Sequence, residues 1–159
     1  MKKIILFSLM FLMIVSTKIF SQNNVKLSGG PSSTCYVTAD SILYVWGNNK
    51  TRLGVGILGT GGFQDKYLTP QQITLPNGLK VVDGNTGSGS HFLAVDEQKN
   101  VWGWGNNSKG QVGNGTVLGE DAFVSTPTRV KASAEIDSLH KDSNQNLINV
   151  KSVHCGSLN

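Results

Sequence analysis

The sequence contains one segment twice, and this repeat limits the possible folds more than any other feature. The first copy, VTADSILYVWGNN, occupies residues 37–49, and the second, AVDEQKNVWGWGNN, occupies 94–107. At an offset of 58 residues, the Trp-Gly-Asn-Asn tetrapeptides at 46–49 and 104–107 coincide. A repeat of this length is a structural unit that cannot bury its hydrophobic surface alone, so neighbouring units must stack against it. The chain is therefore expected to form a propeller or a solenoid.

The alignment continues beyond the tetrapeptides when one residue is inserted. Residues 53–56 (LGVG) then correspond to 112–115 (VGNG), and the Thr-Pro pairs at 69–70 and 126–127 also correspond. The similarity thus extends from the tetrapeptide through most of a repeat.

A third unit begins near the end of the sequence. Residues 150–159 (VKSVHCGSLN) resemble the approach to the second unit, with Gly156 in the place of Gly87. The expected division is a first unit at about 26–83, a second at about 84–152 and a third that begins at about 153, all within 22–159.

Each unit has the composition of short strands joined by turns. Residues 92–95 and 100–104 are rich in aromatic and β-branched side chains, and the turn-forming segment 96–99 separates them. Glycine, at 19 of 159 residues, is more frequent than the roughly 7% of average proteins, as expected for many tight turns. Only 132–147, an apparent insertion, could hold a helical turn. Four short strands in each unit favour a propeller blade over a solenoid, so the predicted fold is all-β: a partial β-propeller of about two blades and the start of a third.

The three motifs GSGSHFLAV (87–95), NVWGWGNN (100–107) and GQVGNG (110–115) resemble the repeat of the regulator of chromosome condensation family, in its secreted bacterial type. The resemblance implies a seven-bladed β-propeller with one repeat for each blade. Seven units at this spacing would need roughly 400 residues. The chain is therefore expected to be an N-terminal fragment, with the missing downstream blades of the same protein as one partner.

The residues that carry the resemblance are expected to be structural, because packing and turn geometry account for them. The tryptophans would pack between blades, and His91 would begin a strand near the propeller axis. The expected blade signature consists of Trp46, Gly47, Gly54, Gly87, His91, Trp104, Gly105 and Gly113.

The first unit departs from the second at several positions. Ser33 stands where the second unit has His91, and Pro31 interrupts the approach to the strand. In the alignment above, Arg52 stands where the second unit has Gly110. Such departures are expected in a terminal repeat.

The N-terminal residues 1–21 have the three regions of a signal peptide. Lys2 and Lys3 precede an apolar run at 4–15, and small and polar residues follow. The apolar run spans only ~18 Å as a helix, against ~30 Å for the hydrocarbon core of a membrane, so stable membrane insertion is not expected. The predicted location is therefore outside the cell or in the cell envelope.

Charge gives no support for binding to nucleic acid. Without Lys2, Lys3 and Lys18, the 14 basic residues fall to 11 against 10 acidic ones, and no basic cluster is visible.

The two cysteines, Cys35 and Cys155, would permit one disulfide in an oxidising compartment, but they lie in different units, which favours two small buried side chains.

The sequence predicts no catalytic, cofactor or metal site. His91, His140 and His154 have no spacing typical of metal ligands, and His154 and Cys155 would point to opposite faces of a strand. The chain is therefore expected not to be an enzyme.

The favoured function is a secreted, non-catalytic module that presents loops to a protein or a glycan, because loops commonly carry binding in repeat folds. The alternatives that the family resemblance implies are a guanine nucleotide exchange factor and an inhibitor of β-lactamase. An exposed aromatic side chain would serve as an interface anchor, although each phenylalanine could equally pack onto its own blade. The candidate contact residues are Phe63, Asp65, Glu120 and Phe123, and the insertion around 135–146 is a further candidate loop.

Overall fold

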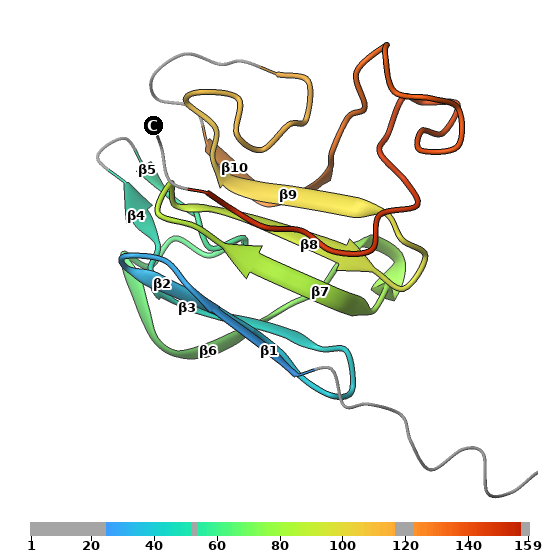
Figure 1. Ribbon diagram of the computed structural model, residues 1–159. Helices are drawn as coiled ribbons and strands as arrows, with labels where there is room; N and C mark the ends of the chain where they lie inside the picture. Colours follow the sequence, from blue (N-terminus) through green and yellow to red (C-terminus); the bar gives the residue numbers. More distant parts are fainter. Residues whose placement is uncertain (1–24, 52–53, 117–122, 157–159) are drawn as a thin grey trace, which may run out of the picture.

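The computed structural model describes residues 25–51, 54–116 and 123–156, and their main elements are two four-stranded antiparallel sheets (Figure 1). The expectation of an all-β, partly built propeller is confirmed. The first sheet has the strand order β1-β2-β3-β6 and the second β10-β9-β8-β7. In the sequence, a small hairpin, β4-β5, lies between β3 and β6 of the first sheet, and one 3-10 turn, η2, lies between β6 and β7. The elements are β1 (Lys26–Gly29), β2 (Ser33–Val37), β3 (Leu43–Asn48), β4 (Lys50–Thr51), β5 (Gly54–Val55), β6 (Lys66–Ile73), η2 (Pro76–Gly78), β7 (Val81–Thr86), β8 (His91–Asp96), β9 (Val101–Asn106) and β10 (Phe123–Arg129).

The repeated segment forms the same strand pair in both sheets. In the first sheet Thr34 lies opposite Trp46, and in the second Phe92 lies opposite Trp104, with the same offset of 58 residues on both strands. Successive side chains point to opposite faces of a strand. Because the two strand pairs have the same register, corresponding residues lie on corresponding faces of the two sheets.

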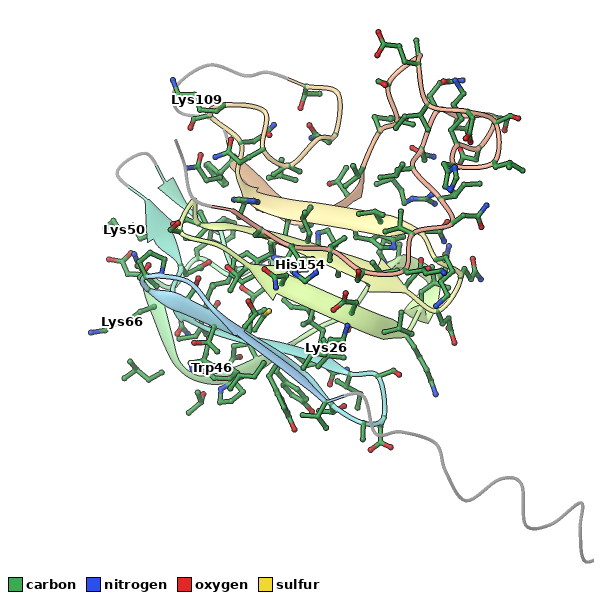
Figure 2. The ribbon with its side chains drawn as sticks, in the orientation of Figure 1. Lys26, Trp46, Lys50, Lys66, Lys109 and His154 are labelled. Carbon is green, nitrogen blue, oxygen red and sulfur yellow. The ribbon has the colours of Figure 1, made fainter. Side chains whose placement is uncertain are left out.

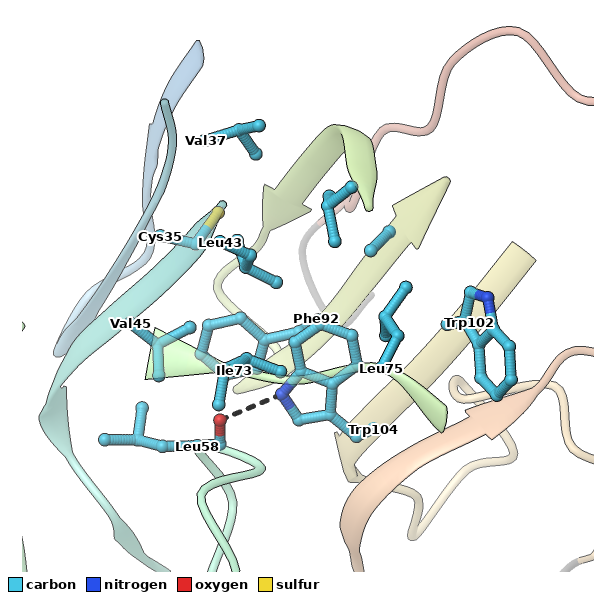
Figure 3. Close-up of a cluster of buried hydrophobic side chains, with 12 residues drawn as sticks. Cys35, Val37, Leu43, Val45, Leu58, Ile73, Leu75, Phe92, Trp102 and Trp104 are labelled. Carbon is cyan, nitrogen blue, oxygen red and sulfur yellow. Dashed lines mark hydrogen bonds between the residues drawn. The ribbon is translucent and has the colours of Figure 1, made fainter. Parts of the chain in front are cut away.

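The main hydrophobic core lies between the two sheets (Figure 3). The first sheet contributes aliphatic side chains such as Val45, and the second contributes the aromatic residues Phe92 and Trp104. The buried members are Cys35, Val37, Leu43, Val45, Leu58, Ile73, Leu75, Val81, Phe92, Ala94, Trp102 and Trp104.

β1, β7 and segment 150–156 are far apart in the sequence and lie side by side in the structure. The Ser28 hydroxyl donates to the Thr86 carbonyl oxygen (3.1 Å), which joins β1 to β7. The backbone N–H of Cys155 donates to Asn85 Oδ1 (3.0 Å), which joins 150–156 to β7. The buried carboxylate of Asp83 binds on both sides: to the Lys26 ammonium (2.8 Å) and to the backbone N–H of Val153 (3.0 Å). Segment 150–156 therefore follows β7 in space as β7 follows β1.

The sheets and the sequence units have different boundaries. β7 runs from Val81 to Thr86, across the boundary placed between residues 83 and 84. The insertion at 132–147 forms turns and isolated bridges in place of the helical turn that its composition permits. The proposed signal peptide at 1–21 lies outside the described residues. Within the described ranges, no helix has the length and apolar character needed to cross a membrane.

Candidate functional site

Trp104 joins the two sheets, as expected for a residue that packs between blades. Its ring stacks on Phe92 with a centroid distance of 5.5 Å, and its side chain is 1% exposed. The indole Nε1–H donates to the carbonyl oxygen of Leu58 (3.0 Å), in a loop of the first unit (Figure 3). A Cβ atom on Gly59 would lie 2.6 Å from the indole, so only glycine permits this approach.

Trp46 occupies the same strand position in the first sheet, but its surroundings differ. Its side chain is half-buried and lies on the side of the first sheet that faces away from β7, β8 and β9 (Figure 2). The two tryptophans therefore have the same position in the strand register, but Trp104 is buried and Trp46 is only half-buried.

Gly47 and Gly105 of the blade signature are required by the backbone. Both have positive φ, at 115° and 97°. A Cβ atom on Gly105 would lie 2.6 Å from the Ser90 carbonyl oxygen, and one on Gly47 would meet the Ser32 carbonyl oxygen in the same way. Positive φ and close approach of backbone together select glycine.

Asn49 and Asn107 are fully buried and organise the loops that follow β3 and β9. The side-chain oxygen of Asn49 accepts the backbone N–H of Leu58 (2.9 Å), and that of Asn107 accepts the N–H of Val112 (3.0 Å). Neither residue was among the predicted signature residues. Both are the last residue of the repeated Trp-Gly-Asn-Asn tetrapeptide, and this repetition is the sequence feature that could have identified them.

These hydrogen bonds correct the loop alignment derived from the sequence. The N–H groups of Gly56 and Gly110 each donate to the carbonyl oxygen of the buried Asn of their own unit. Loop 56–61 (GILGTG) therefore corresponds to 110–115 (GQVGNG), at an offset of 54 residues. Consistently, φ is positive at all three glycines of both loops: Gly56, Gly59, Gly61, Gly110, Gly113 and Gly115.

Gly54 is consequently not the counterpart of Gly113, and Arg52 does not replace Gly110. Gly54 lies in the β4-β5 hairpin, where it pairs with Thr51. This hairpin adds four residues to the first unit. The sequence alignment did not place these four residues in the hairpin, because short Gly-rich segments match one another in more than one register.

His91 is the first residue of β8, and Gly87 directly follows β7. His91 is 7% exposed, its Nδ1 atom has no hydrogen-bond partner, and desolvation by burial lowers the pKa of its imidazole. Gly87 allows 150–156 to approach, because a Cβ atom there would lie 2.8 Å from that of Cys155.

The four predicted contact residues fall into three groups. Phe63 is 85% exposed, and Asp65 is exposed and pairs with Lys50 (2.9 Å). Phe123 is half-buried, and its ring would lie 3.5 Å from a Cβ atom on Gly56, so it packs back against the first unit. Glu120 lies outside the described residues.

The buried Asn49 fixes the backbone on both sides of the exposed Phe63. The Asn49 Nδ2 group donates to the carbonyl oxygens of Gly62 (3.1 Å) and Gln64 (2.8 Å), the two neighbours of Phe63. The backbone N–H of Asn49 also donates to the carbonyl oxygen of Asp65 (2.8 Å). Residues 59–66, the Phe63 loop, thus present an aromatic ring to solvent from a backbone fixed on both sides.

The insertion contains a copy of the turn between β8 and β9. Asn100 Nδ2 donates to Asp96 Oδ2 (2.8 Å), and Asn146 Nδ2 donates to Asp142 Oδ2 (3.0 Å). The backbone and side-chain N–H groups of Asn146 lower the pKa of Asp142. Arg129 attaches this turn to the second sheet, because it lies near Asp142 (3.7 Å) and over the Trp102 ring (5.5 Å).

The described residues contain no group of three or more His, Cys, Asp or Glu side chains that could hold a metal ion. Cys35 and Cys155 are free thiols in the structure. Burial raises the pKa of Cys35 to about 12 and that of Cys155 to about 11, which makes both thiols poor nucleophiles.

Comparison with known families gives two overlapping matches. The family model "Regulator of chromosome condensation (RCC1) repeat" matches residues 81–111 and 100–158. Among characterised relatives, the ultraviolet-B receptor UVR8 of Arabidopsis thaliana is 40% identical over 107 residues, which cover 67% of this chain and 22% of the receptor. Human E3 ubiquitin-protein ligase HERC2 is 33% identical over 134 residues, which cover 84% of this chain and 2% of the ligase.

Solved structures agree on the fold. The crystal structure of human WBSCR16 gives a TM-score of 0.57 at 23% identity, with 84% of this chain and 29% of that chain covered. Yeast RCC1 (Prp20) bound to Kap60 gives a TM-score of 0.57 at 21% identity, with 83% and 28% covered. This chain spans less than a third of each of these proteins. The repeated motifs, the equivalent sheets and these matches agree, and the chain therefore belongs to the regulator of chromosome condensation (RCC1) repeat family.

Proposed function

We propose that the protein is an exported, non-catalytic binding module whose Phe63 loop contacts a protein partner. One observation carries the proposal: Phe63 is 85% exposed, while the buried Asn49 fixes the carbonyl groups on both sides of it. Propellers of this family are binding or regulatory modules: yeast RCC1 (Prp20) has been solved bound to Kap60, and a second yeast Prp20p structure is described with its binding to Gsp1p and histones.

The physical advantage of this loop is preorganisation. A free loop loses conformational entropy when a partner orders it, whereas a loop already held by hydrogen bonds loses less. Large aromatic side chains that enter a partner's pocket are frequent anchors of protein interfaces. Asp65 of the same loop pairs with Lys50, so the region offers one charge of each sign, which suits the polar rim of a protein interface.

The test places a photo-crosslinking amino acid at position 63 of the full chain, identifies the linked partner, and measures the affinity of that partner for variants. Phe63→Ala should weaken binding about 30-fold, as expected for an interface hot spot. Leu27→Ala is the matched control, because Leu27 is also exposed but lies in β1, at the opposite edge of the first sheet from β6. Equal affinity of the Phe63→Ala variant and the unmodified chain would refute the role of the loop.

Three further assays separate this proposal from its competitors. Accelerated nucleotide release from a small GTPase would favour an exchange factor, and inhibition of a β-lactamase would favour an inhibitor. Binding on a glycan array that depends on Phe63 would replace the protein partner with a glycan.

Export rests on residues 1–21, whose charged start and apolar run have the pattern of a signal peptide. The processed protein recovered outside the cytoplasm should begin at Gln22. Recovery of the chain only inside cells, with Met1 intact, would contradict export.

A further inference from the structure

The sequence contains the pair Asn-Gly twice, at 77–78 and 114–115. An Asn side chain that precedes glycine is open to attack by the next backbone nitrogen, because glycine has no side chain to hinder the approach. The attack closes a succinimide ring at the side-chain Cγ atom and expels ammonia, and water then opens the ring. The two pairs have the same covalent chemistry, and their surroundings in the structure differ.

Three donors converge on the side-chain oxygen of Asn114. The backbone N–H of Thr116 (3.1 Å), the Thr116 hydroxyl (2.7 Å) and the Nδ2 group of the fully buried Asn107 (3.3 Å) all donate to Asn114 Oδ1. The Asn107 amide is held in place, because it also donates to the Thr116 carbonyl oxygen (2.9 Å) and accepts the backbone N–H of Val112 (3.0 Å). Negative charge develops on Oδ1 when a nitrogen attacks Cγ. Donors that already point at this atom therefore stabilise the transition state.

The other pair, Asn77-Gly78, lies in η2 and has the opposite arrangement. Asn77 is exposed, and no group of the residues that the structure describes donates to its side-chain oxygen. The attacking nitrogen is engaged instead, because the Gly78 N–H donates to the carbonyl oxygen of Leu75 (3.1 Å). Folding thus hinders the reaction at Asn77 and favours it at Asn114.

Asn114 is accessible to water, which the reaction needs. It is half-buried, and the two residues that follow it are exposed. Gly61, the counterpart of Gly115 in the first unit, is also exposed, although the second sheet covers the rest of that loop. A Cβ atom on Gly61 would meet no heavy atom within 4 Å. A neighbouring unit placed on loop 110–115 would therefore leave this site open.

We propose that Asn114 is a modification site of the folded chain and deamidates without an enzyme. The Gly115 nitrogen forms a bond to Asn114 Cγ, the bond from Cγ to Nδ2 breaks, and the Gly115 amide proton leaves with the ammonia. Water then cleaves either C–N bond of the succinimide ring and returns a proton to the nitrogen, which gives aspartate or isoaspartate. Both products place a negative charge on loop 110–115 at neutral pH. The inference does not depend on the function proposed for Phe63.

The test incubates the chain folded in buffer and unfolded in urea, and follows deamidation of each pair by mass spectrometry of proteolytic fragments. In urea Asn77 and Asn114 should react at similar rates, because their covalent chemistry is the same. In buffer Asn114 should react at least ~10-fold faster than in urea, and Asn77 should react more slowly than in urea. An Asn114 rate that folding leaves unchanged or lowers would overturn the proposal.

Two substitutions of the exposed Thr116 isolate the contribution of its hydroxyl donor. Thr116→Val keeps the backbone N–H and should slow the reaction of the folded chain about 10-fold. Thr116→Ser is the matched control, because it retains a hydroxyl, and it should react at nearly the rate of the unmodified chain. All three chains should react alike in urea. Equal rates of the two variants in buffer would also overturn the proposal.

Asn114→Thr verifies the assignment of the fragment. This variant places the residue of the first unit, Thr60, in the second unit, and deamidation of the fragment that contains position 114 should disappear. Circular dichroism of each variant verifies that the sheets are intact.

Discussion

Trp46 and Trp104 stand at the same position of two similar sheets, yet one is half-buried and the other is 1% exposed. The difference does not come from the strands, whose register is the same. It comes from what lies opposite each ring: a loop of the first unit covers Trp104, and Trp46 lies on the side of the first sheet that faces away from β7, β8 and β9. In a repeat protein the burial of a residue is thus decided by the neighbouring unit as well as by its own.

Replacement of the two tryptophans gives the largest expected difference. Trp104→Ala should lower the free energy of unfolding by about 3–5 kcal/mol, because it empties a packed site and leaves the Leu58 carbonyl oxygen without its donor. Trp46→Ala should cost about 1 kcal/mol or less at a dilution where the chain is monomeric. Urea denaturation of both variants measures the difference. Equal losses would show that coverage does not distinguish the two sites.

The equivalent loop glycines Gly59 and Gly113 give a smaller effect of the same kind. Gly59→Ala should destabilise the chain by roughly 2–4 kcal/mol, since it combines positive φ with a clash against Trp104. Gly113→Ala carries the backbone strain but meets only Val130 Cγ1 at 3.2 Å, so about 1–2 kcal/mol is expected. Thermal unfolding of the two variants tests this order, and a reversed order would contradict the structural alignment of the loops.

The repeated strands were predictable because a period of 58 residues is visible in their side chains. The loops were not, because the four residues of the β4-β5 hairpin can be placed in several ways when only Gly and aliphatic residues are compared. Hydrogen bonds to Asn49 and Asn107 decide that alignment. The exposure of Phe63 and the burial of Phe123 were equally undecided, because both depend on contacts with other segments.

The smallest expected effect concerns pH and the position where the two units carry different residues, Ser33 and His91. Burial lowers the pKa of His91 from 6.5 in the folded chain. The unfolded chain therefore takes up the proton first as the pH falls. The stabilising contribution of the neutral imidazole is present above pH 6.5 and is lost as the pH falls from there through the folded pKa.

The His91→Ser variant, which places the residue of the first unit in the second, should lose less stability than the unmodified chain between about pH 7 and pH 5. Urea midpoints measured at several pH values give the slope. A slope that the substitution leaves unchanged would assign the acid sensitivity to other groups.

Hydrogen exchange of the indole N–H groups, followed by NMR on a dilute sample, tests the equivalence and unequal coverage of the two tryptophans most directly. The Trp104 signal should exchange slowly, because its N–H is bonded to Leu58 within the core, and the Trp46 signal should exchange much faster. Two equally protected signals, or a Trp104 signal that exchanges as fast as that of Trp46, would contradict the account.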